Sequence, residues 1–268
     1  MKKNIFRSLF ENTYLFLMFL FLYFPIVMLM IFSFNSVKST SNWKGFSFRW
    51  YEQMFSDEAL LEAFANTITI GILAAVISCI IGTAAAIGIQ GYRTKKAKGL
   101  INALTNLPMV SSELVMGVSM MILFLYVKIP LGYATLLMSH ITFCVPYVIV
   151  SVLPKLVQLD TGLYEAALDL GAKPFYAFRK VVIPEIKPGV ISGLLISFTL
   201  SIDDFVISFF TTGNGVSNLS IYIYSSVRRG VNPMYNALST IMFVIVALLL
   251  FMINKRSGGK NNAPSIIP

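Results

Sequence analysis

The chain contains 268 residues, of which 56% are hydrophobic and only 12% are charged. Soluble globular domains carry about 25% charged residues, so this composition excludes an ordinary soluble domain. The apolar runs are continuous and lack the alternation of barrel strands, which favours membrane-crossing helices. The predicted fold is therefore all-α, a polytopic integral membrane protein with a single transmembrane domain over residues 1–268.

Six apolar runs approach or exceed the roughly 20 residues that a helix needs to cross a bilayer. In chain order, we expect spans at residues 13–34, 61–90, 100–127, 131–157, 189–212 and 236–253. The first run is too long for the apolar part of a signal peptide, so we expect it to remain as an anchor. The second is rich in Gly and Ala, which predicts close packing in the bundle interior or at a subunit interface.

The distribution of Lys and Arg predicts the orientation of these spans, because cytoplasmic loops of membrane proteins are enriched in both. With both termini in the cytoplasm, the cytoplasmic segments hold 15 of the 21 basic residues. The net charge of +9 follows from this topology, so it gives no reason to expect a nucleic-acid partner.

Residues 160–188, between the fourth and fifth spans, form the longest charged segment between two apolar blocks. An amphipathic helix is predicted at its start by the i, i+3, i+4, i+7 spacing of Leu163, Ala166, Ala167 and Leu170. Asp160 or Thr161 could cap this helix, and Gly171 stands where a left-handed residue would end it.

A second short helix is expected to begin at Pro174, and Pro184 and Pro188 are expected to end it. Small residues at Ala166, Ala167 and Gly171 would let another surface approach the backbone closely. The segment is therefore predicted to be a docking element, with an interfacial helix lying on lipid headgroups as the alternative.

The docking segment also resembles a signature of permeases in binding-protein-dependent, ATP-driven importers (type I ABC importers). Those permeases carry Glu-Ala-Ala, three residues, Gly, nine residues and then Ile-x-Leu-Pro in a cytoplasmic loop. The matching residues here are Glu165, Ala166, Ala167, Gly171, Val181, Val182, Ile183 and Pro184. The resemblance implies a coupling helix that fits a cleft on a separate cytoplasmic ATPase, with coupling carried by Glu165, Ala166, Ala167, Gly171, Ile183 and Pro184. ATP would then be bound by that partner, and this chain would need no cofactor of its own.

Glu113, Asp203 and Asp204 are carboxylates inside predicted spans, away from the span ends. Each costs about 2.5–3.5 kcal/mol near a helix centre on insertion scales, and no Lys or Arg lies in the middle of a span to pair with them; Lys155 stands at the end of the fourth. One interpretation is a water-filled path lined by acids, which would favour a cationic substrate. The other is that these groups are protonated, or bonded to Ser201, Ser208 or a partner helix.

The remaining reactive side chains form no recognisable catalytic or metal-binding pattern. His140 is the single histidine and has no second ligand at metal spacing, so we expect a hydrogen-bonded packing residue rather than a proton carrier. Cys79 and Cys144 both lie within apolar runs without redox or metal spacing. The chain is therefore expected to perform no covalent chemistry and not to be an enzyme.

The runs Ser197–Gly213 and Ile221–Thr240 resemble the second permease subunit of spermidine/putrescine importers, and the resemblance extends over nearly the whole chain. It implies half of a translocation path for polyamines in the bacterial cytoplasmic membrane. The implied partners are cytoplasmic ATPase subunits, a second homologous permease and an extracytoplasmic substrate-binding protein, which would meet the outer loops at 35–59 and 213–235.

Three alternatives stay open. The chain could be a secondary transporter that uses Glu113, Asp203 and Asp204 as a proton relay, although it lacks the inverted repeats of many such transporters. It could be a scaffold whose loop recruits a cytoplasmic partner without transport. It could also be an importer for another solute, such as an amino acid, a sugar, sulfate or molybdate, although a basic-lined path would be expected for the two anions.

Overall fold

The computed structural model describes residues 2–39, 42–92, 94–213, 215–228 and 232–244. In this part of the chain all regular elements are helical, and the one pairing of extended residues is an isolated bridge between Asn35 and Phe46. The all-α prediction is therefore confirmed for the described residues. The chain divides into two compact units, residues 59–224 and residues 1–58 with 225–268, and each is described by itself.

The unit formed by the two chain ends contains α1 (Lys2–Ser33), α2 (Arg49–Ser56) and a helix at 233–244. The connection from α1 to α2 is organised around Asn35, whose side chain is fully buried. Its amide nitrogen donates to the carbonyl oxygens of Ser39 and Asn42 at 2.9 and 2.7 Å. The indole of Trp50 donates to the Asn35 carbonyl at 2.5 Å, which ties α2 back to this turn.

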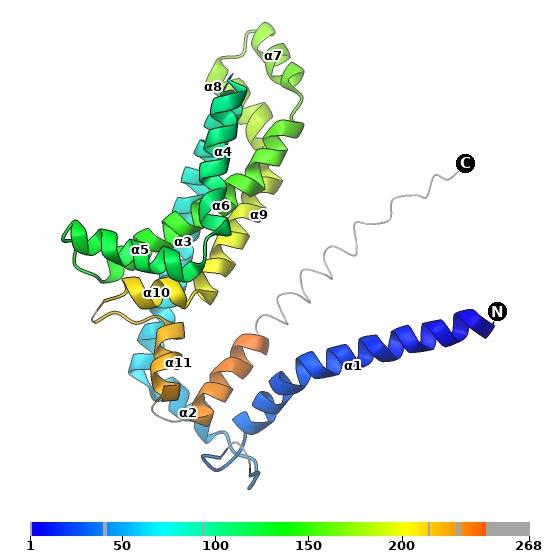
Figure 1. Ribbon diagram of the computed structural model, residues 1–268, viewed down its shortest axis with the longest axis vertical. Helices are drawn as coiled ribbons and strands as arrows, with labels where there is room; N and C mark the ends of the chain where they lie inside the picture. Colours follow the sequence, from blue (N-terminus) through cyan, green and yellow to red (C-terminus); the bar gives the residue numbers. More distant parts are fainter. Residues whose placement is uncertain (1, 40–41, 93, 214, 229–231, 245–268) are drawn as a thin grey trace. The chain divides into compact units, whose positions relative to one another are not determined.

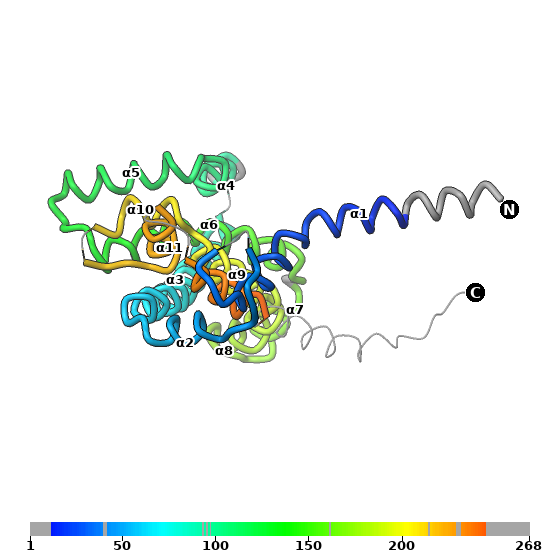
Figure 2. Tube along the Cα trace, turned by 90° about the horizontal axis from the view of Figure 1, so that it is seen from below, coloured from blue at the N-terminus to red at the C-terminus, as the bar shows by residue number. Residues whose placement is uncertain are grey.

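The central unit holds the elements that position the candidate site. In chain order they are α3 (Glu58–Gly91), α4 (Lys95–Val110), α5 (Glu113–Tyr126), α6 (Tyr133–Gln158), α7 (Thr161–Asp169), α8 (Pro174–Ala177), a π-helix (Phe178–Val182), α9 (Ile183–Asp203), α10 (Val206–Thr211) and α11 (Leu219–Arg228). Helices α6 and α9 pack along one another, with α7 and α8 at one end of the pair and α10 at the other (Figure 1). Figure 2 shows α5 and α10 side by side, on the same side of α6.

Two glycines let α9 approach α6 closely. A Cβ atom at Gly189 would lie 2.8 Å from the Ser151 carbonyl oxygen, and one at Gly193 would lie 3.2 Å from the Cα of Val148. No hydrophobic driving force acts between helices in lipid, so their association depends on van der Waals packing. Small residues allow the two backbones to approach closely enough for this packing. The buried cluster around Val148, Val152 and Ile186 surrounds this contact.

We expect Gly189→Ala to destabilise the α6–α9 pair by about 1–3 kcal/mol, because the added methyl group meets backbone rather than a flexible side chain. Gly88→Ala in α3 is the matched control, since a Cβ there meets nothing within 4 Å. Thermal unfolding of the two purified variants in detergent measures the difference. Equal midpoints for both variants would contradict this account of the packing.

Four helices among the described residues are long and apolar enough to cross a membrane: Asn12–Ser33, Glu58–Gly91, Tyr133–Gln158 and Pro174–Asp203. They coincide with the first, second, fourth and fifth predicted spans, although the fifth begins earlier than expected. A bent pair, Lys98–Val110 with Glu113–Tyr126, would make a fifth. The predicted span 236–253 overlaps the helix at 233–244, and the rest of it lies outside the described residues.

The third expected span, residues 100–127, is formed by two helices rather than one straight helix. Helices α4 and α5 meet at 103°, with extended backbone at Ser111 and Ser112 between them. Pro108 has no N–H to donate to the carbonyl one turn earlier, and at the end of α4 both the N–H and the hydroxyl of Ser111 donate to the Leu107 carbonyl, at 3.1 and 2.8 Å. The α-helix therefore ends where the sequence reading continued it.

The expectation that Pro184 and Pro188 would end the loop helix is also wrong. Helix α8, the π-helix and α9 form one continuous helical segment from Pro174 to Asp203. The π-turn shifts the hydrogen-bond register, so that the Ile183 N–H bonds to the Phe178 carbonyl, and Pro184 falls in the first turn of α9. The segment then breaks at Asp204 and Phe205, inside the predicted span 189–212.

Candidate functional site

The docking segment begins with α7, and the structure confirms both of its predicted ends. Asp160 has extended backbone and its Oδ1 accepts from the Gly162 N–H at 2.9 Å. At the other end Gly171 has a φ of +84°, in the left-handed region. The N–H groups of Gly171 and Ala172 bond to the carbonyls of Leu168 and Ala167, the pattern of a Schellman motif.

The surface of this segment is open in the described structure. A Cβ atom at Gly171 would meet nothing within 4 Å, and Glu165 and Ala166 are exposed while Ala167 is half-buried. Large apolar side chains lie beside them without cover, with Leu170 88% exposed and Phe175 76% exposed. Such an apolar patch around a glycine corner is suited to contact with another surface.

Ile183 and Pro184, the last two predicted coupling residues, lie beyond α8 on the continuous segment. Both are exposed, and Ile183 lines a groove against α3 together with Cys79 and Thr83. The structure therefore places Ile183 beside α3, whereas Glu165, Ala166 and Gly171 belong to the exposed corner of α7.

At the opposite end of α9, the two adjacent aspartates have different surroundings. Asp203 is exposed at the last residue of α9, whereas Asp204 is 7% exposed. The Asp204 carboxylate accepts three hydrogen bonds, from the Ile207 N–H at 3.2 Å and from the N–H and hydroxyl of Ser208, both at 2.8 Å. For Asp204, the interpretation that the carboxylate is bonded to Ser208 therefore holds, and its bonds anchor the start of α10. Of the two aspartates, only Asp203 is exposed.

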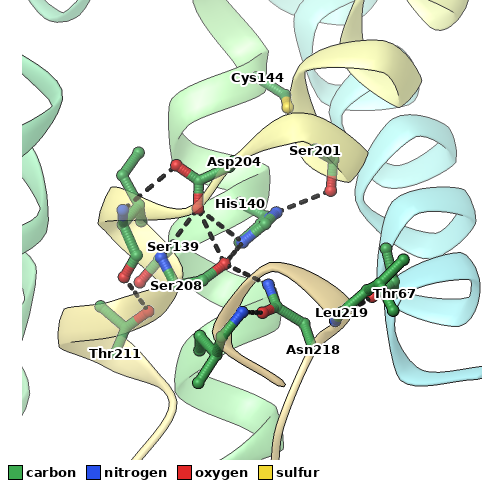
Figure 3. A network of polar contacts seen from close by, with 12 residues as sticks. Thr67, Ser139, His140, Cys144, Ser201, Asp204, Ser208, Thr211, Asn218 and Leu219 are labelled. Atoms are coloured by element: carbon green, nitrogen blue, oxygen red, sulfur yellow. Dashed lines mark hydrogen bonds and ion pairs between the residues drawn. The ribbon is translucent and has the colours of Figure 1, made fainter. Parts of the chain in front are cut away.

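His140 of α6 contacts the junction between α9 and α10 (Figure 3). Its Nδ1 lies 2.7 Å from the Ser201 hydroxyl and its Nε2 lies 2.9 Å from the Ser208 hydroxyl. The same Nε2 is 3.5 Å from an oxygen of Asp204. The expectation of a hydrogen-bonded residue is met, but sequence reasoning did not connect His140 with the aspartates.

Further hydrogen bonds connect the junction between α9 and α10 to neighbouring elements of the central unit. Asn218 donates to the Ser208 hydroxyl at 2.7 Å, and the Leu219 N–H donates to Thr67 of α3 at 2.8 Å. On α6, the Thr135 hydroxyl donates to the Thr211 carbonyl at 2.9 Å. We call the group of His140, Ser201, Asp204, Ser208 and Asn218 the corner network (Figure 3). The sequence signal that could have indicated this network is the spacing of Ser201, Asp204 and Ser208, which are polar residues three and four positions apart in an apolar run.

Glu113 lies in the first turn of α5 and is exposed. The structure brings α5 against α10, since a Cβ atom at Gly117 would lie 3.0 Å from the Phe210 ring and 3.3 Å from the Cα of Ile207. Glu113 of α5 and Asp203 of α9 are thus exposed acids, whereas Asp204 is buried in the corner network. No group of three or more His, Cys, Asp or Glu within the described ranges could hold a metal ion.

Comparison with known proteins identifies relatives over most of the chain. Residues 80–256 match one family, the binding-protein-dependent transport system inner membrane component. The spermidine/putrescine transport system permease protein PotC of Haemophilus influenzae is 39% identical over 256 residues, covering 96% of this chain and 99% of its own length. The putrescine transport system permease protein PotI of Escherichia coli K12 is 38% identical over 252 residues, covering 92% of this chain and 90% of its own.

Solved structures share the fold at lower sequence identity. A chain of a bacterial ABC transporter involved in the import of the acidic polysaccharide alginate superposes with a TM-score of 0.75 at 16% identity, covering 96% of this chain and 98% of its own. A chain of an amino acid ABC transporter superposes with a TM-score of 0.58 at 18% identity, covering 77% and 98%.

Proposed function

Because the chain belongs to the family of binding-protein-dependent transport system inner membrane components, and is thus a multi-pass transport subunit rather than an enzyme, we propose that it forms half of the path of an ATP-driven polyamine importer. The observation that carries the substrate class is the near-full-length similarity to permeases named for spermidine and putrescine. Exposed carboxylates at Glu113 and Asp203 agree with it, because polyamines carry several positive charges.

The proposed topology has six spans with both termini in the cytoplasm. Four long apolar helices, the bent pair of α4 and α5, and the helix beginning at 233 support this number. The enrichment of Lys and Arg in the segments assigned to the cytoplasm supports the orientation. The docking segment 160–188 then faces the cytoplasm, and the loops 35–59 and 213–235 face outward.

In this proposal the docking segment receives a cytoplasmic ATPase subunit, which binds the ATP. The exposed corner of α7 around Gly171 is the contact surface, and the segment Pro174–Asp203 transmits its displacement. At about 1.5 Å per residue, these 30 residues reach about 45 Å, so one continuous helical segment runs from the docking segment to Asp203. A second homologous permease supplies the other half of the path, and an extracytoplasmic binding protein delivers substrate to the outer loops.

Reconstitution tests the proposal against its alternatives. The chain is placed in proteoliposomes with the ATPase, second permease and binding protein produced from the same source, and uptake of radiolabelled spermidine is measured. We expect uptake that requires both ATP and the binding protein. Uptake by this chain alone under a proton gradient would support a secondary transporter, and ATP-driven uptake of a different solute would redirect the substrate class.

A further inference from the structure

The break between α9 and α10 is bridged by a single imidazole. Ser201 lies in the last turn of α9 and Ser208 in α10, so the two ring nitrogens of His140 bond to elements on opposite sides of Asp204. His140 is 1% exposed, and both serines are buried. The ring therefore connects the last turn of α9 and the start of α10 to α6.

The hydrogen bonds around Ser208 fix the direction of the bridge. Its one hydroxyl proton goes to Asp204, and its oxygen accepts from Asn218. The Nε2 of His140 must then donate to the second acceptor site of Ser208. A neutral imidazole with its proton on Nε2 leaves Nδ1 as the acceptor for the Ser201 hydroxyl, so every member of the bridge has a partner.

The bridge lies at the end of the continuous helical segment that, in the proposed function, transmits displacement from the docking segment. Any displacement of the segment Pro174–Asp203 along its axis moves Ser201 relative to α6, whereas Ser208 also bonds to Asp204 and to Asn218. The exposed side chain of Asp203 is attached to the end of the moving segment, two residues beyond Ser201. Through its bond to Ser201, the ring therefore contributes to the position of Asp203 relative to α10.

We propose that His140 is a positioning residue for polyamine transport, which holds Asp203 in its substrate-facing position by bonding simultaneously to Ser201 and Ser208. The inference rests on the proposed function, in which Asp203 faces the path. It assigns His140 no contact with substrate and no transfer of a proton. His140 affects transport through the geometry of the junction between α9 and α10.

Two substitutions of His140, which we call half-replacements, each keep one of its two hydrogen bonds and remove the other. In His140→Asn the amide oxygen can take the place of Nδ1 and accept from Ser201, and in His140→Gln the amide nitrogen can take the place of Nε2 and donate to Ser208. Neither variant can bond to both sides as the ring does. Ser139→Ala is the matched control, because Ser139 is equally buried on α6 but its hydroxyl, among the described residues, bonds to the Thr135 carbonyl of its own helix.

Uptake kinetics of the complete importer in proteoliposomes provide the test. We expect both half-replacements to raise the KM for spermidine about threefold to tenfold, the change that loss of one net hydrogen bond produces, with Ser139→Ala close to wild type. In an Asp203→Asn background the same replacements should change KM little further. Detergent melting curves report any general loss of folding.

The outcomes are distinct. Wild-type KM in both half-replacements, or a KM that rises equally with and without Asp203, would overturn the role of His140. A KM that follows the melting temperature across all variants, Ser139→Ala included, would also overturn it. If Asp203→Asn alone leaves KM unchanged while spermidine is still taken up, the path assignment of Asp203 and the role of His140 both fail, and the importer function stands.

Discussion

Replacing Gly171 with leucine is expected to lower ATP-driven uptake by about tenfold or more and to weaken retention of the ATPase. The residue has a φ of +84°, and a left-handed conformation costs a residue with a side chain about 1–2 kcal/mol. The space around it is open in this chain, so an added Cβ would meet no neighbouring atom within 4 Å. The added side chain would instead occupy the surface offered to the ATPase.

Two controls separate backbone strain from blocked docking at this corner. Gly171→Asn tests the backbone, because asparagine tolerates the left-handed region better than leucine. Gly215→Leu is matched in conformation and space, with a φ of +91° and nothing within 4 Å of the added Cβ, but lies in the proposed outer loop. ATPase co-purification should be lost with Gly171→Leu and kept with Gly215→Leu. Normal co-purification and uptake in Gly171→Leu would remove the corner from the coupling contact.

Asp203→Asn and Asp204→Asn are expected to differ strongly, although the two residues are adjacent in sequence. Asp203 is exposed, and no hydrogen bond to its carboxylate is found within the described residues. Its neutralisation should raise the KM for polyamines while the complex still assembles. We expect about a tenfold rise, since removal of one close opposite charge in a partly screened site is worth about 1–2 kcal/mol.

Asp204→Asn should act mainly on folding. The carboxylate accepts three bonds in a buried site, and an amide nitrogen in place of one oxygen would face the Ser208 donors. Hydrogen bonds to charged groups contribute about 1.5–3 kcal/mol, so we expect a lower melting temperature and less assembled complex. Melting curves and uptake kinetics on both variants check the contrast. A stable Asp204→Asn protein with a selective loss of polyamine affinity would place Asp204 in the path instead.

The sequence could not show that the two aspartates differ, with Asp203 proposed to act in transport and Asp204 in folding. Both sit in an apolar run, and helical periodicity alone places them about 100° apart on one helix. The structure ends α9 between them, which exposes one carboxylate and gives the other to the N–H groups of α10. Likewise, His140 is 61 residues from Ser201 and 68 from Ser208, so its role depends on packing that no local pattern encodes.

The amino-acid sequence by itself determined the membrane class, the helical fold and both ends of α7. Apolar length and the chemistry of Asp160 and Gly171 are local properties, and their energies do not depend on distant contacts. The 103° bend between α4 and α5, the passage of the helical segment through Pro184 and Pro188, and the corner network were decided only by the tertiary structure. In lipid a free backbone or polar group must find a partner within the protein, and which partner is near enough depends on how α6, α9 and α10 pack.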